Sequence, residues 1–508
     1  MLRATPTARV TSRPPANATA SLVSSRPNSP PDGSLGVVGS DHHPFEFASE
    51  ANAHFDRDRT ATVTLTLRFA DGTLVVEGDA VPDHPLLYAD DRSGVYRAPA
   101  QRYPAVRAAL EAADPALEDR VFRGEGPGPL ETSYELRSYQ RAALDDWRDA
   151  DARGVIELPT GSGKTVVAIA AIAERSVPTL VVVPTLDLLA QWVEELETEF
   201  DTPVGRLGGG DQRIEPVTVS TYDTMRLRAD ELGDRFRFVV FDEVHHLGGA
   251  GNREAAELLA APARLGLTAT FERPDGAHEA VADVVGPLVH SRDAEALAGE
   301  HLAPYDVKRI RVELTEGERA AYETAQGTFT DYLARSGLQL RSGADYRELV
   351  KRSGTDPDAR EALLAKERAR GIVMNASRKL EELAAILDRH REDRIIVFTA
   401  RNELAYRIAD RFLVPVITHQ TGAEERQELL DRFREGSYSR IVSSNVLDEG
   451  IDVPDANVGV ICSGSGSRRE FTQRLGRLLR PKRDGGRALL YELVADETAE
   501  ERVANRRR

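Results

Sequence analysis

A short loop at residues 158–165, Leu-Pro-Thr-Gly-Ser-Gly-Lys-Thr, has the residue types and spacing of a phosphate-binding loop. Gly161 and Gly163 allow backbone N–H groups to converge on an anion, and Lys164 adds a positive charge for the β- and γ-phosphates. The Thr165 hydroxyl is suited to hold Mg²⁺. The residues predicted to contact a nucleotide are Thr160, Gly161, Ser162, Gly163, Lys164 and Thr165.

The sequence on either side of this loop supports the same interpretation. The apolar run at 154–158 predicts a buried strand, and the run at 166–173 predicts a helix. The loop would therefore lead into a helix N-terminus, where the helix dipole attracts anions. Leu158 stands where this pattern usually has its first glycine. A glycine-rich turn after a core strand is the alternative, which the strand–loop–helix context disfavours.

Two carboxylates, Asp242 and Glu243, follow a second apolar run at 238–241. Asp242 is placed to hold Mg²⁺ opposite the phosphate loop, and Glu243 could activate the attacking water. An acidic strand end at the surface is the alternative. His245 and His246 come next, but we reject a zinc site because the sequence has no second ligand cluster at zinc spacing. Upstream, the Gln140 amide could pair with an adenine edge.

Length and composition limit the class of protein. At 508 residues the chain is too long for one core, and several domains are expected. The single cysteine, Cys462, excludes a disulfide framework and any four-cysteine metal site. The sequence has no run of about 18 apolar residues, so it predicts no membrane span. Its N-terminus lacks the apolar stretch of a signal peptide. We therefore expect a cytoplasmic protein with no membrane partner.

The net charge of −17 argues at first against a nucleic-acid partner. Only six residues are lysine, however, so nearly all the positive charge is arginine. Abundant acid with scarce lysine is typical of proteins adapted to high salt, and this predicts a halophilic source. The acidity would then reflect the solvent and not the ligand. Because the screening length is about 3 Å at 1 M salt, nucleic-acid contacts should depend on hydrogen bonds, helix N-termini and stacking.

The pattern along the chain predicts five segments. Residues 1–58 are rich in Pro and Ser and predict a disordered extension. Residues 59–125 predict a small α+β module with a hairpin turn at Asp71-Gly72 and a helix at 105–113. Residues 130–295 and 376–508 predict two α/β domains with parallel sheets, and 313–372 a helical insertion between them. Strands are predicted at 155–158, 180–183, 217–221, 238–241 and 265–268, then at 395–398, 414–418, 441–443, 458–462 and 489–494.

Nine short motifs make residues 134–480 resemble the superfamily 2 helicases. They lie in the family's order at 139–140, 161–165, 183–185, 220–222, 242–245, 267–270, 396–399, 447–454 and 473–480. The Gly-Ser-Gly-Ser-Arg-Arg segment at 464–469, the helical insertion and the small N-terminal module are most similar to XPB-type DNA repair helicases, especially the archaeal ones. The resemblance implies two RecA-like domains, a thumb-like insertion and a damage-recognition module.

The resemblance also implies an ATP-dependent mechanism with Mg²⁺ as cofactor. Arg477 and Arg480, three apart on one helix face, would be catalytic arginine fingers alongside Lys164, Asp242 and Glu243. Gly450 and Asp452 would contact the nucleotide from the second domain. Other implied roles are nucleic-acid binding by Pro184, Thr185, Thr221 and Thr399, and coupling of nucleotide state to domain closure by Thr268 and Thr270.

Two features of the resemblance concern DNA more directly. A cluster of Tyr346, Arg347, Lys351 and Arg352 in the thumb-like insertion could grip DNA, or could be a solvated charged face. The family's strand-separating Arg-Glu-Asp triplet is Arg273-Pro274-Asp275 here, so Arg273 and Asp275 are kept while proline replaces the central acid. This departure predicts translocation with weak duplex unwinding.

We therefore expect an ATP-dependent DNA helicase or translocase acting in repair, with a nuclease as a second partner. One alternative is the motor subunit of a restriction-type complex, although no nuclease motif is visible in the chain. Another is a DNA-binding scaffold with a vestigial ATP site. The intact set of Lys164, Asp242, Glu243, Arg477 and Arg480 argues against a vestigial site.

Overall fold

The computed structural model describes residues 65–78, 80–114, 116–272, 276–297, 305–340, 343–444, 456–463 and 488–505. The predictions made for residues 1–58 and for Arg273, Asp275, Gly450, Asp452, Arg477 and Arg480 lie outside these residues. The described part contains three β-sheets, of five, eight and six strands. None of its helices is long and apolar enough to cross a membrane.

The small N-terminal module combines a five-stranded sheet with one helix. Its strands are β1 (Thr66–Ala70), β2 (Thr73–Glu77), β3 (Tyr88–Asp90), β4 (Val95–Pro99) and β5 (Glu118–Arg120), in the order β3-β4-β2-β1-β5. The predicted hairpin turn is confirmed, because Ala70 pairs with Thr73 and both Asp71 and Gly72 have positive φ angles. A short η1 (Ala100–Arg102) precedes α1 (Tyr103–Ala113), which covers the sheet through buried Val106 and Leu110.

The first α/β domain is built on an eight-stranded sheet ordered β13-β6-β12-β11-β7-β10-β8-β9. The strands are β6 (Arg153–Glu157), β7 (Thr179–Val183), β8 (Gly205–Gly208), β9 (Asp211–Arg213), β10 (Val217–Thr221), β11 (Phe238–Phe241), β12 (Ala263–Thr268) and β13 (Leu288–Ser291). All neighbours pair in parallel except β8 and β9. The five central strands agree with the predicted ones to within two residues, whereas β8, β9 and β13 were not predicted.

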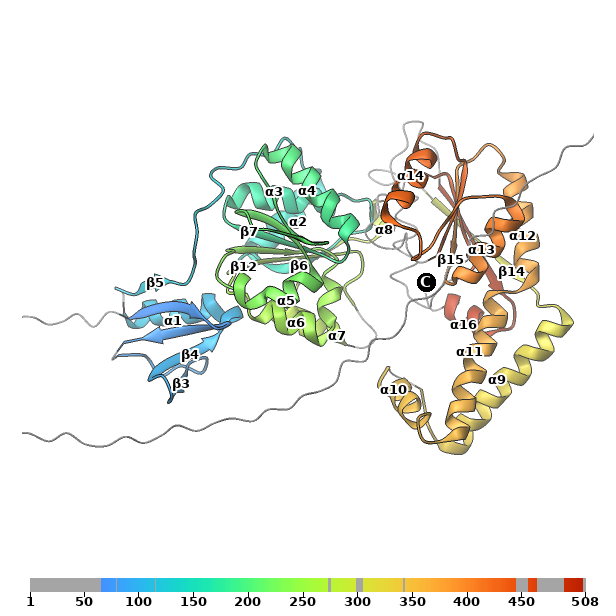
Figure 1. Ribbon diagram of the computed structural model, residues 1–508, viewed down its shortest axis with the longest axis horizontal. Coiled ribbons are helices and arrows are strands. Elements are labelled where there is room, and N and C mark those ends of the chain that lie inside the picture. The colour runs from blue at the N-terminus through green and yellow to red at the C-terminus, as the bar shows by residue number, and fades with distance from the viewer. Residues whose placement is uncertain are drawn as a thin grey trace, which may run out of the picture. The chain divides into compact units, whose positions relative to one another are not determined.

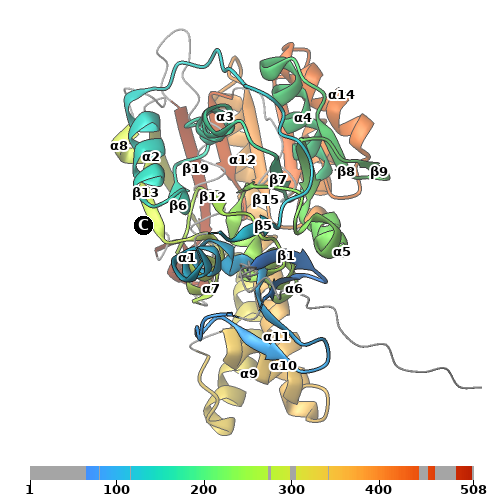
Figure 2. The ribbon, with the colours of Figure 1, turned by 90° about the vertical axis from the view of Figure 1, so that its left-hand side faces the viewer.

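Helices cover both faces of this sheet, as Figures 1 and 2 show. One face carries α2 (Ser138–Asp149), α3 (Lys164–Arg175) and α4 (Leu186–Phe200), and the other carries α5 (Tyr222–Leu232), α6 (Ala250–Glu257) and α7 (Ala277–Val285). A 3₁₀ turn, η2 (Val244–Gly248), and a short α8 (Ala294–Leu297) complete the domain. Because both faces are covered, the central strands are buried along their whole length.

The second α/β domain has six parallel strands in the order β14-β19-β18-β15-β17-β16. They are β14 (Tyr305–Val312), β15 (Ile395–Thr399), β16 (Val416–Ile417), β17 (Arg440–Ser444), β18 (Val458–Ile461) and β19 (Ala488–Ala495). Its helices are α12 (Ser377–Arg389), α13 (Asn402–Phe412), α14 (Ala423–Arg434) and α16 (Ala499–Asn505).

The helical insertion consists of α9 (Glu316–Ser336), α10 (Gly343–Arg352) and α11 (Pro357–Met374), with α9 and α11 side by side (Figure 1). We expected it between the two α/β domains, and this was wrong. The strand β14 precedes the insertion and pairs with β19 over all eight residues, so the insertion lies within the second domain. The strand β14 has the sequence Tyr-Asp-Val-Lys-Arg-Ile-Arg-Val, and an edge strand can carry so many charges. Because of these charges, we did not predict a strand here.

Candidate active site and nucleic-acid interface

The predicted site residues of the first domain lie at one edge of its sheet. Parallel strands present their carboxyl ends at the same edge, where α/β proteins bind ligands. The phosphate loop follows β6, Asp242 follows β11, and Thr268 ends β12 between them. Thr185 follows β7, and Thr221 ends β10. The fold therefore gathers segments that are more than a hundred residues apart in the chain.

Backbone conformation explains the glycines of the phosphate loop. Gly161 and Gly163 have φ angles of 82° and 80°, a region that side chains other than glycine rarely adopt. A Cβ atom added at Gly163 would lie 2.5 Å from Nε2 of Gln140. Gly163 is the N-cap of α3, so Lys164 is the first helical residue. The loop therefore has the strand–turn–helix geometry of an anion cradle.

The side chains of the loop leave polar groups that suit a phosphate ligand. Lys164 Nζ donates to the carbonyl oxygens of Leu158 (3.1 Å) and Pro159 (3.4 Å), which holds its charge over the cradle. The Thr160 hydroxyl oxygen is buried and has no hydrogen-bond partner among the described residues. A buried hydroxyl without a partner is costly unless a ligand satisfies it. The loop thus fits a nucleotide phosphate by its backbone, its charge and its unsatisfied donor.

Gln140 is buried and hydrogen-bonds the backbone of the phosphate loop. Its Nε2 donates to the carbonyl oxygens of Ser162 (2.9 Å) and Gly163 (3.3 Å), and its Oε1 accepts from the Arg137 backbone N–H (2.9 Å). The Tyr139 hydroxyl donates to the same Ser162 carbonyl over 2.5 Å. Both ends of the amide that we predicted to pair with adenine therefore hydrogen-bond within the protein. The adenine contact stays a prediction.

Asp242 lies in a buried setting at the end of β11. Its Oδ2 accepts from Trp192 Nε1 (2.9 Å), and its Oδ1 accepts from the Glu243 backbone N–H (3.0 Å). Burial raises the pKa of the Asp242 carboxyl, while the Trp192 N–H and the nearby Lys164 charge oppose that rise. Glu243 adopts a left-handed conformation with φ of 47°, which is sparsely populated for such residues and recurs at functional sites.

His245 lies between Glu243 and the end of β12. Its ring is 3% exposed, with Nδ1 3.4 Å from Thr268 Oγ1 and 3.5 Å from Glu243 Oε2. The Thr268 hydroxyl donates to the Thr270 carbonyl (3.0 Å) and accepts from the Thr270 N–H (3.1 Å). The predicted coupling residues Thr268 and Thr270 are therefore in hydrogen-bond contact with each other and next to the predicted catalytic pair.

Two of the predicted nucleic-acid contacts are N-caps of helices. Thr185 accepts from the Leu188 N–H at the start of α4, and Thr221 accepts from the Thr224 N–H at the start of α5, each over 3.2 Å. Helix N-termini bind phosphates. Thr399 at the end of β15 differs, because it is fully buried and its hydroxyl donates to the Arg401 carbonyl (3.0 Å). A contact through the Thr399 side chain would require this bond to open.

Three residues that the structure adds to the site could not be identified from the sequence. Trp192 and Tyr222 both hydrogen-bond Asp242, with the Tyr222 hydroxyl donating to its backbone carbonyl over 3.0 Å. Glu157 Oε1 accepts from the Phe271 N–H over 3.0 Å and so ties the strand before the phosphate loop to the segment after Thr270. Trp192 and Tyr222 resemble ordinary core aromatics in sequence, and only their shared partner identifies them.

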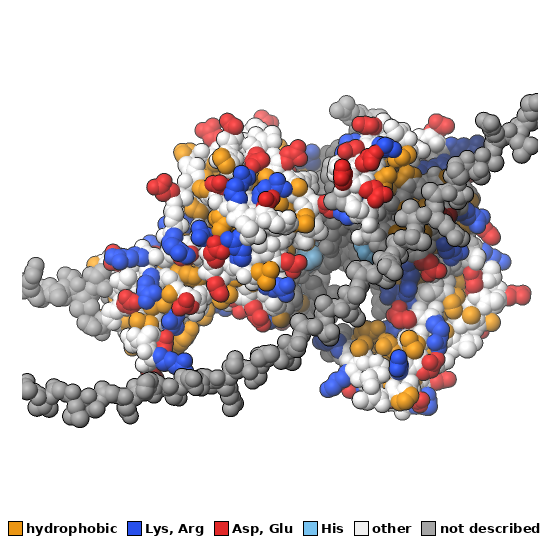
Figure 3. Space-filling model, in the orientation of Figure 1, with side chains coloured by type: hydrophobic (Ala, Val, Ile, Leu, Met, Phe, Trp, Pro, Cys, Tyr) orange, Lys and Arg blue, Asp and Glu red, His pale blue; other side chains and the backbone are white. Residues whose placement is uncertain are grey.

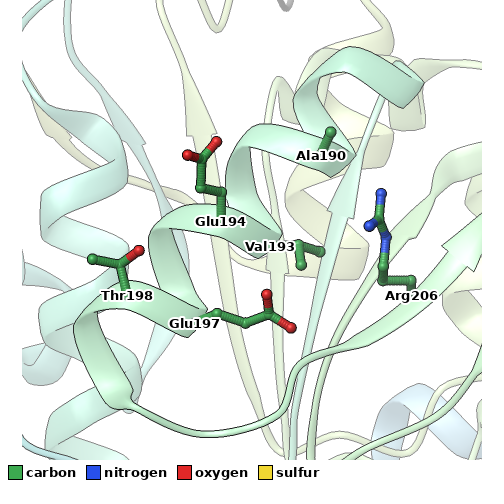
Figure 4. Close-up of a pocket in the computed structure, with 6 residues that line it drawn as sticks. All are labelled: Ala190, Val193, Glu194, Glu197, Thr198 and Arg206. Atoms are coloured by element: carbon green, nitrogen blue, oxygen red, sulfur yellow. The ribbon is translucent and has the colours of Figure 1, made fainter.

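A separate hollow of about 450 Å³ lies on the outer side of α4 (Figure 4). It is lined by Ala190, Val193, Glu194, Glu197 and Thr198 of α4 and by Arg206 of β8. None of the predicted site residues lines it. On the face of the molecule that Figure 3 shows, acidic and basic side chains are interspersed. The net charge of −17 is thus not gathered into one acidic patch on this face.

Three family models match the chain in order. They are the "Xeroderma pigmentosum group B helicase damage recognition domain" at residues 67–121, the "Type III restriction enzyme, res subunit" at 133–273 and the "ERCC3/RAD25/XPB C-terminal helicase" at 361–508. The chain is 42% identical to the DNA 3′-5′ translocase XPB2 of Sulfurisphaera tokodaii over 87% of its own length and 99% of that protein. It is 34% identical to the DNA 3′-5′ helicase XPB of Mycobacterium tuberculosis over 74% of its length, but it spans only 63% of that relative.

These matches identify the chain as a superfamily 2 helicase. It belongs to the XPB family, because the damage-recognition and C-terminal helicase models both match and a relative aligns over nearly its whole length. A solved structure, the Hef helicase domain of Pyrococcus furiosus, is 21% identical and superposes with a TM-score of 0.47 over 73% of this chain and 98% of that one.

Proposed function

We propose that this chain is an ATP-driven DNA translocase or helicase that moves 3′ to 5′ and acts in DNA repair. The observation that carries the proposal is the meeting of the phosphate loop and the Asp242–Glu243 pair at the carboxyl edge of one parallel sheet. The direction of movement and the DNA substrate come from the names of the relatives, DNA 3′-5′ translocase and DNA 3′-5′ helicase.

Each residue of the first domain has a distinct proposed role in hydrolysis. The loop from Thr160 to Thr165 binds the phosphates, with Lys164 supplying the positive charge. Thr165 and Asp242 would hold Mg²⁺, which neutralises phosphate charge when bound. Glu243 orients the attacking water and takes its proton. The hydrogen bond between His245 and Thr268 would couple the Asp242–Glu243 pair to the end of β12.

The second domain completes the proposed mechanism. Arg477 and Arg480 would stabilise the charge that develops on the transferred phosphoryl group, and Gly450 and Asp452 would contact the nucleotide. Thr185, Thr221 and the segment at Thr399, together with Pro184, would bind the DNA backbone without reading its sequence. The module at 67–121 would examine DNA for damage, as its family model suggests. A nuclease partner is proposed on the family resemblance alone.

The match of residues 133–273 to a restriction-enzyme subunit keeps a second function in view. That model covers only the first α/β domain, whereas the XPB models cover the segments on both sides of it. A restriction motor has no need of a damage-recognition module. We therefore favour the repair function over the restriction-type motor.

The proposal is tested by ATP hydrolysis with and without single-stranded and forked DNA, measured over a range of salt concentrations. The wild-type protein should hydrolyse ATP faster when DNA is present and should displace a bound third strand from duplex DNA in the 3′-to-5′ direction. Glu243→Gln should bind ATP but not turn it over. Hydrolysis that ignores DNA, or Glu243→Gln turnover at the wild-type rate, would contradict the proposal.

The departure at Pro274 gives the proposal its second test. Duplex unwinding should be weak in the wild-type protein and stronger in Pro274→Glu, while ATP hydrolysis should be equal in the two because this loop holds no predicted phosphate ligand. Strong unwinding by the wild type that Pro274→Glu does not improve would show that the proline is irrelevant. An activity optimum at low salt would refute the halophilic interpretation of the acidic composition.

A further inference from the structure

Two buried aromatic side chains from different helices donate hydrogen bonds to Asp242. Trp192 of α4 donates its indole N–H to Oδ2 over 2.9 Å, and Tyr222 of α5 donates its hydroxyl to the backbone carbonyl over 3.0 Å. Trp192 is 1% exposed and Tyr222 is 3% exposed. Because water cannot replace either donor, a movement of either helix must lengthen or bend one of these bonds.

The same two helices begin at the residues proposed to contact DNA. Thr185 is the N-cap of α4, and Trp192 lies about two helical turns further along. Thr221 is the N-cap of α5, and Tyr222 directly follows it. Each proposed DNA contact therefore shares a rigid helix with a side chain that holds Asp242.

Neighbouring rings limit how far the Tyr222 side chain can adjust independently of α5. The Tyr222 ring packs 5.5 Å from the His246 ring and 6.5 Å from the Phe241 ring, measured between centroids. On Asp242 itself, Oδ1 accepts from the next residue in its own loop, whereas Oδ2 depends on the more distant α4. The orientation of the Asp242 carboxylate is thus set partly by where α4 lies.

We propose that Trp192 and Tyr222 are positioning residues that transmit DNA contact at Thr185 and Thr221 to the Asp242 carboxylate. The inference rests on the proposed function, since it needs Asp242 to serve the ATP site and the two threonines to meet DNA. A DNA phosphate at either helix N-terminus would shift that helix. Trp192 would then turn the carboxylate directly, whereas Tyr222 would move the Asp242 backbone that carries it. DNA would thereby adjust how Asp242 holds the Mg²⁺–nucleotide complex.

The chain offers a matched control in its other tryptophan. Trp147 is also 1% exposed, and its indole N–H donates to the Arg264 carbonyl over 2.9 Å. Arg264 is the second residue of β12, at the opposite end of that strand from Thr268. Trp147→Phe removes the same kind of buried donor as Trp192→Phe, but at the opposite edge of the sheet, near the start of β12 and not after the end of β11. Because the chain has two tryptophans, it also leaves Trp192 as the only indole.

The first experiment compares three substitutions that each keep an aromatic ring and remove one donor. Trp192→Phe should lower the ratio of DNA-stimulated to basal ATP hydrolysis about tenfold, the size expected when a hydrogen bond to a charged group is lost. It should also raise the Mg²⁺ concentration needed for half-maximal binding of a fluorescent ATP analogue. Tyr222→Phe should lower the ratio less, by about fivefold, since its acceptor is neutral. Trp147→Phe should keep the wild-type ratio.

The results separate the inference from the function on which it rests. If wild-type hydrolysis is stimulated by DNA but Trp192→Phe and Tyr222→Phe keep the ratio of Trp147→Phe, the inference is overturned and the proposed function stands. If DNA does not stimulate wild-type ATP hydrolysis, both the inference and the proposed function are overturned. If Trp192→Phe does not fold, Tyr222→Phe decides, because it keeps the whole ring and loses one oxygen atom.

A second experiment tests the coupling between DNA binding and Asp242 without ATP hydrolysis. In Trp147→Phe protein, adding DNA in the absence of nucleotide should change the fluorescence of Trp192, because its partner Asp242 moves relative to the indole. At 1% exposure the indole cannot stack on a base, so direct contact with DNA cannot cause the change. Binding is followed separately by the anisotropy of labelled DNA. Unchanged emission while DNA is bound would overturn the inference.

Discussion

Replacing Gln140 with alanine should weaken ATP and GTP binding by the same factor. A glutamine that recognises adenine must present one free donor and one free acceptor to the edge of the base. Here the two N–H groups of Nε2 are used by the carbonyls of Ser162 and Gly163, and Oε1 accepts from the Arg137 N–H. An amide that keeps these bonds would act on bound nucleotide only through the phosphate loop, whose shape does not depend on the base.

The magnitude follows from the groups that lose a partner. Without Gln140, the Ser162 carbonyl keeps the Tyr139 hydroxyl and the Gly163 carbonyl keeps the Val167 N–H (3.3 Å), so neither carbonyl is left without a donor. Each carbonyl loses one hydrogen bond, and a hydrogen bond contributes about 0.5–1.5 kcal/mol, which corresponds to roughly 2- to 13-fold in a binding constant for each bond lost. We expect the dissociation constants of both nucleotides to rise within this range, because the weakened loop must adopt its bound conformation when phosphate binds.

The assay is competition of ATP and GTP against a fluorescent nucleotide, on the wild type, Gln140→Ala and Tyr139→Phe. Tyr139→Phe serves as the control, because it removes one support of the same loop without touching an amide. The ratio of ATP to GTP affinity should be equal in the three proteins. A loss confined to ATP in Gln140→Ala would refute this reasoning and show that the amide leaves the loop to pair with adenine.

Three further predictions concern the loop, the thiol and a buried ion pair. Gly163→Ala should abolish nucleotide binding while leaving the fold intact, since its φ of 80° is strained for alanine and its Cβ would displace Gln140; equilibrium binding and a thermal melt check the two parts. Cys462 should resist Ellman's reagent at pH 8 until the protein unfolds, because burial raises the pKa of its thiol to about 12. Since this pKa is higher than in the unfolded chain, the contribution of the thiol to stability is complete below pH 9 and is lost as the pH rises towards 12. Lys379→Ala should destabilise the protein by up to about 3–5 kcal/mol in urea unfolding, because Glu500, 2.7 Å away, would keep the Ala495 N–H but lose its charge partner. Lys379→Met combined with Glu500→Gln should cost much less.

Much of this architecture could be predicted because its signals are local. An apolar run followed by Gly-Ser-Gly-Lys-Thr predicts a strand, a turn and a helix, and β6 and α3 lie there. Likewise, Asp71-Gly72 between alternating residues predicts the hairpin that joins β1 and β2. The strands that escaped prediction lack such signals. Two of the four residues of β8 are glycine, and four of the eight residues of the edge strand β14 are charged, with Lys308 and Arg309 adjacent so that the alternation is broken.

The contacts within the site were harder to predict because they are long-range. Trp192 and Asp242 are fifty residues apart, and Glu157 and Phe271 are more than a hundred apart. No local pattern distinguishes a core tryptophan from one whose N–H meets a carboxylate. Gln140 illustrates the same limit from the other side. Its side-chain chemistry suggested a base contact, but the fold brings its amide against two loop carbonyls first.

The attachment of α9–α11 bears on how the proposed motor would use DNA contacts in this insertion. The chain leaves the second sheet at β14 and returns to it through α12, so both ends of the insertion belong to that sheet. At its base, Glu318 caps α9 by accepting from the Thr315 N–H and also accepts from the Ser377 N–H that opens α12. Arg319 donates to the carbonyls of Asp496 and Glu497 just after β19. Because these contacts attach the base of the insertion to one domain at three points, we expect the insertion to move with that domain. Any grip of Arg347 or Lys351 on DNA would then be carried by the second domain, while Thr185 and Thr221 would hold DNA from the first. Movement of one domain relative to the other would then be converted directly into movement along DNA, which requires no contact that reads a base.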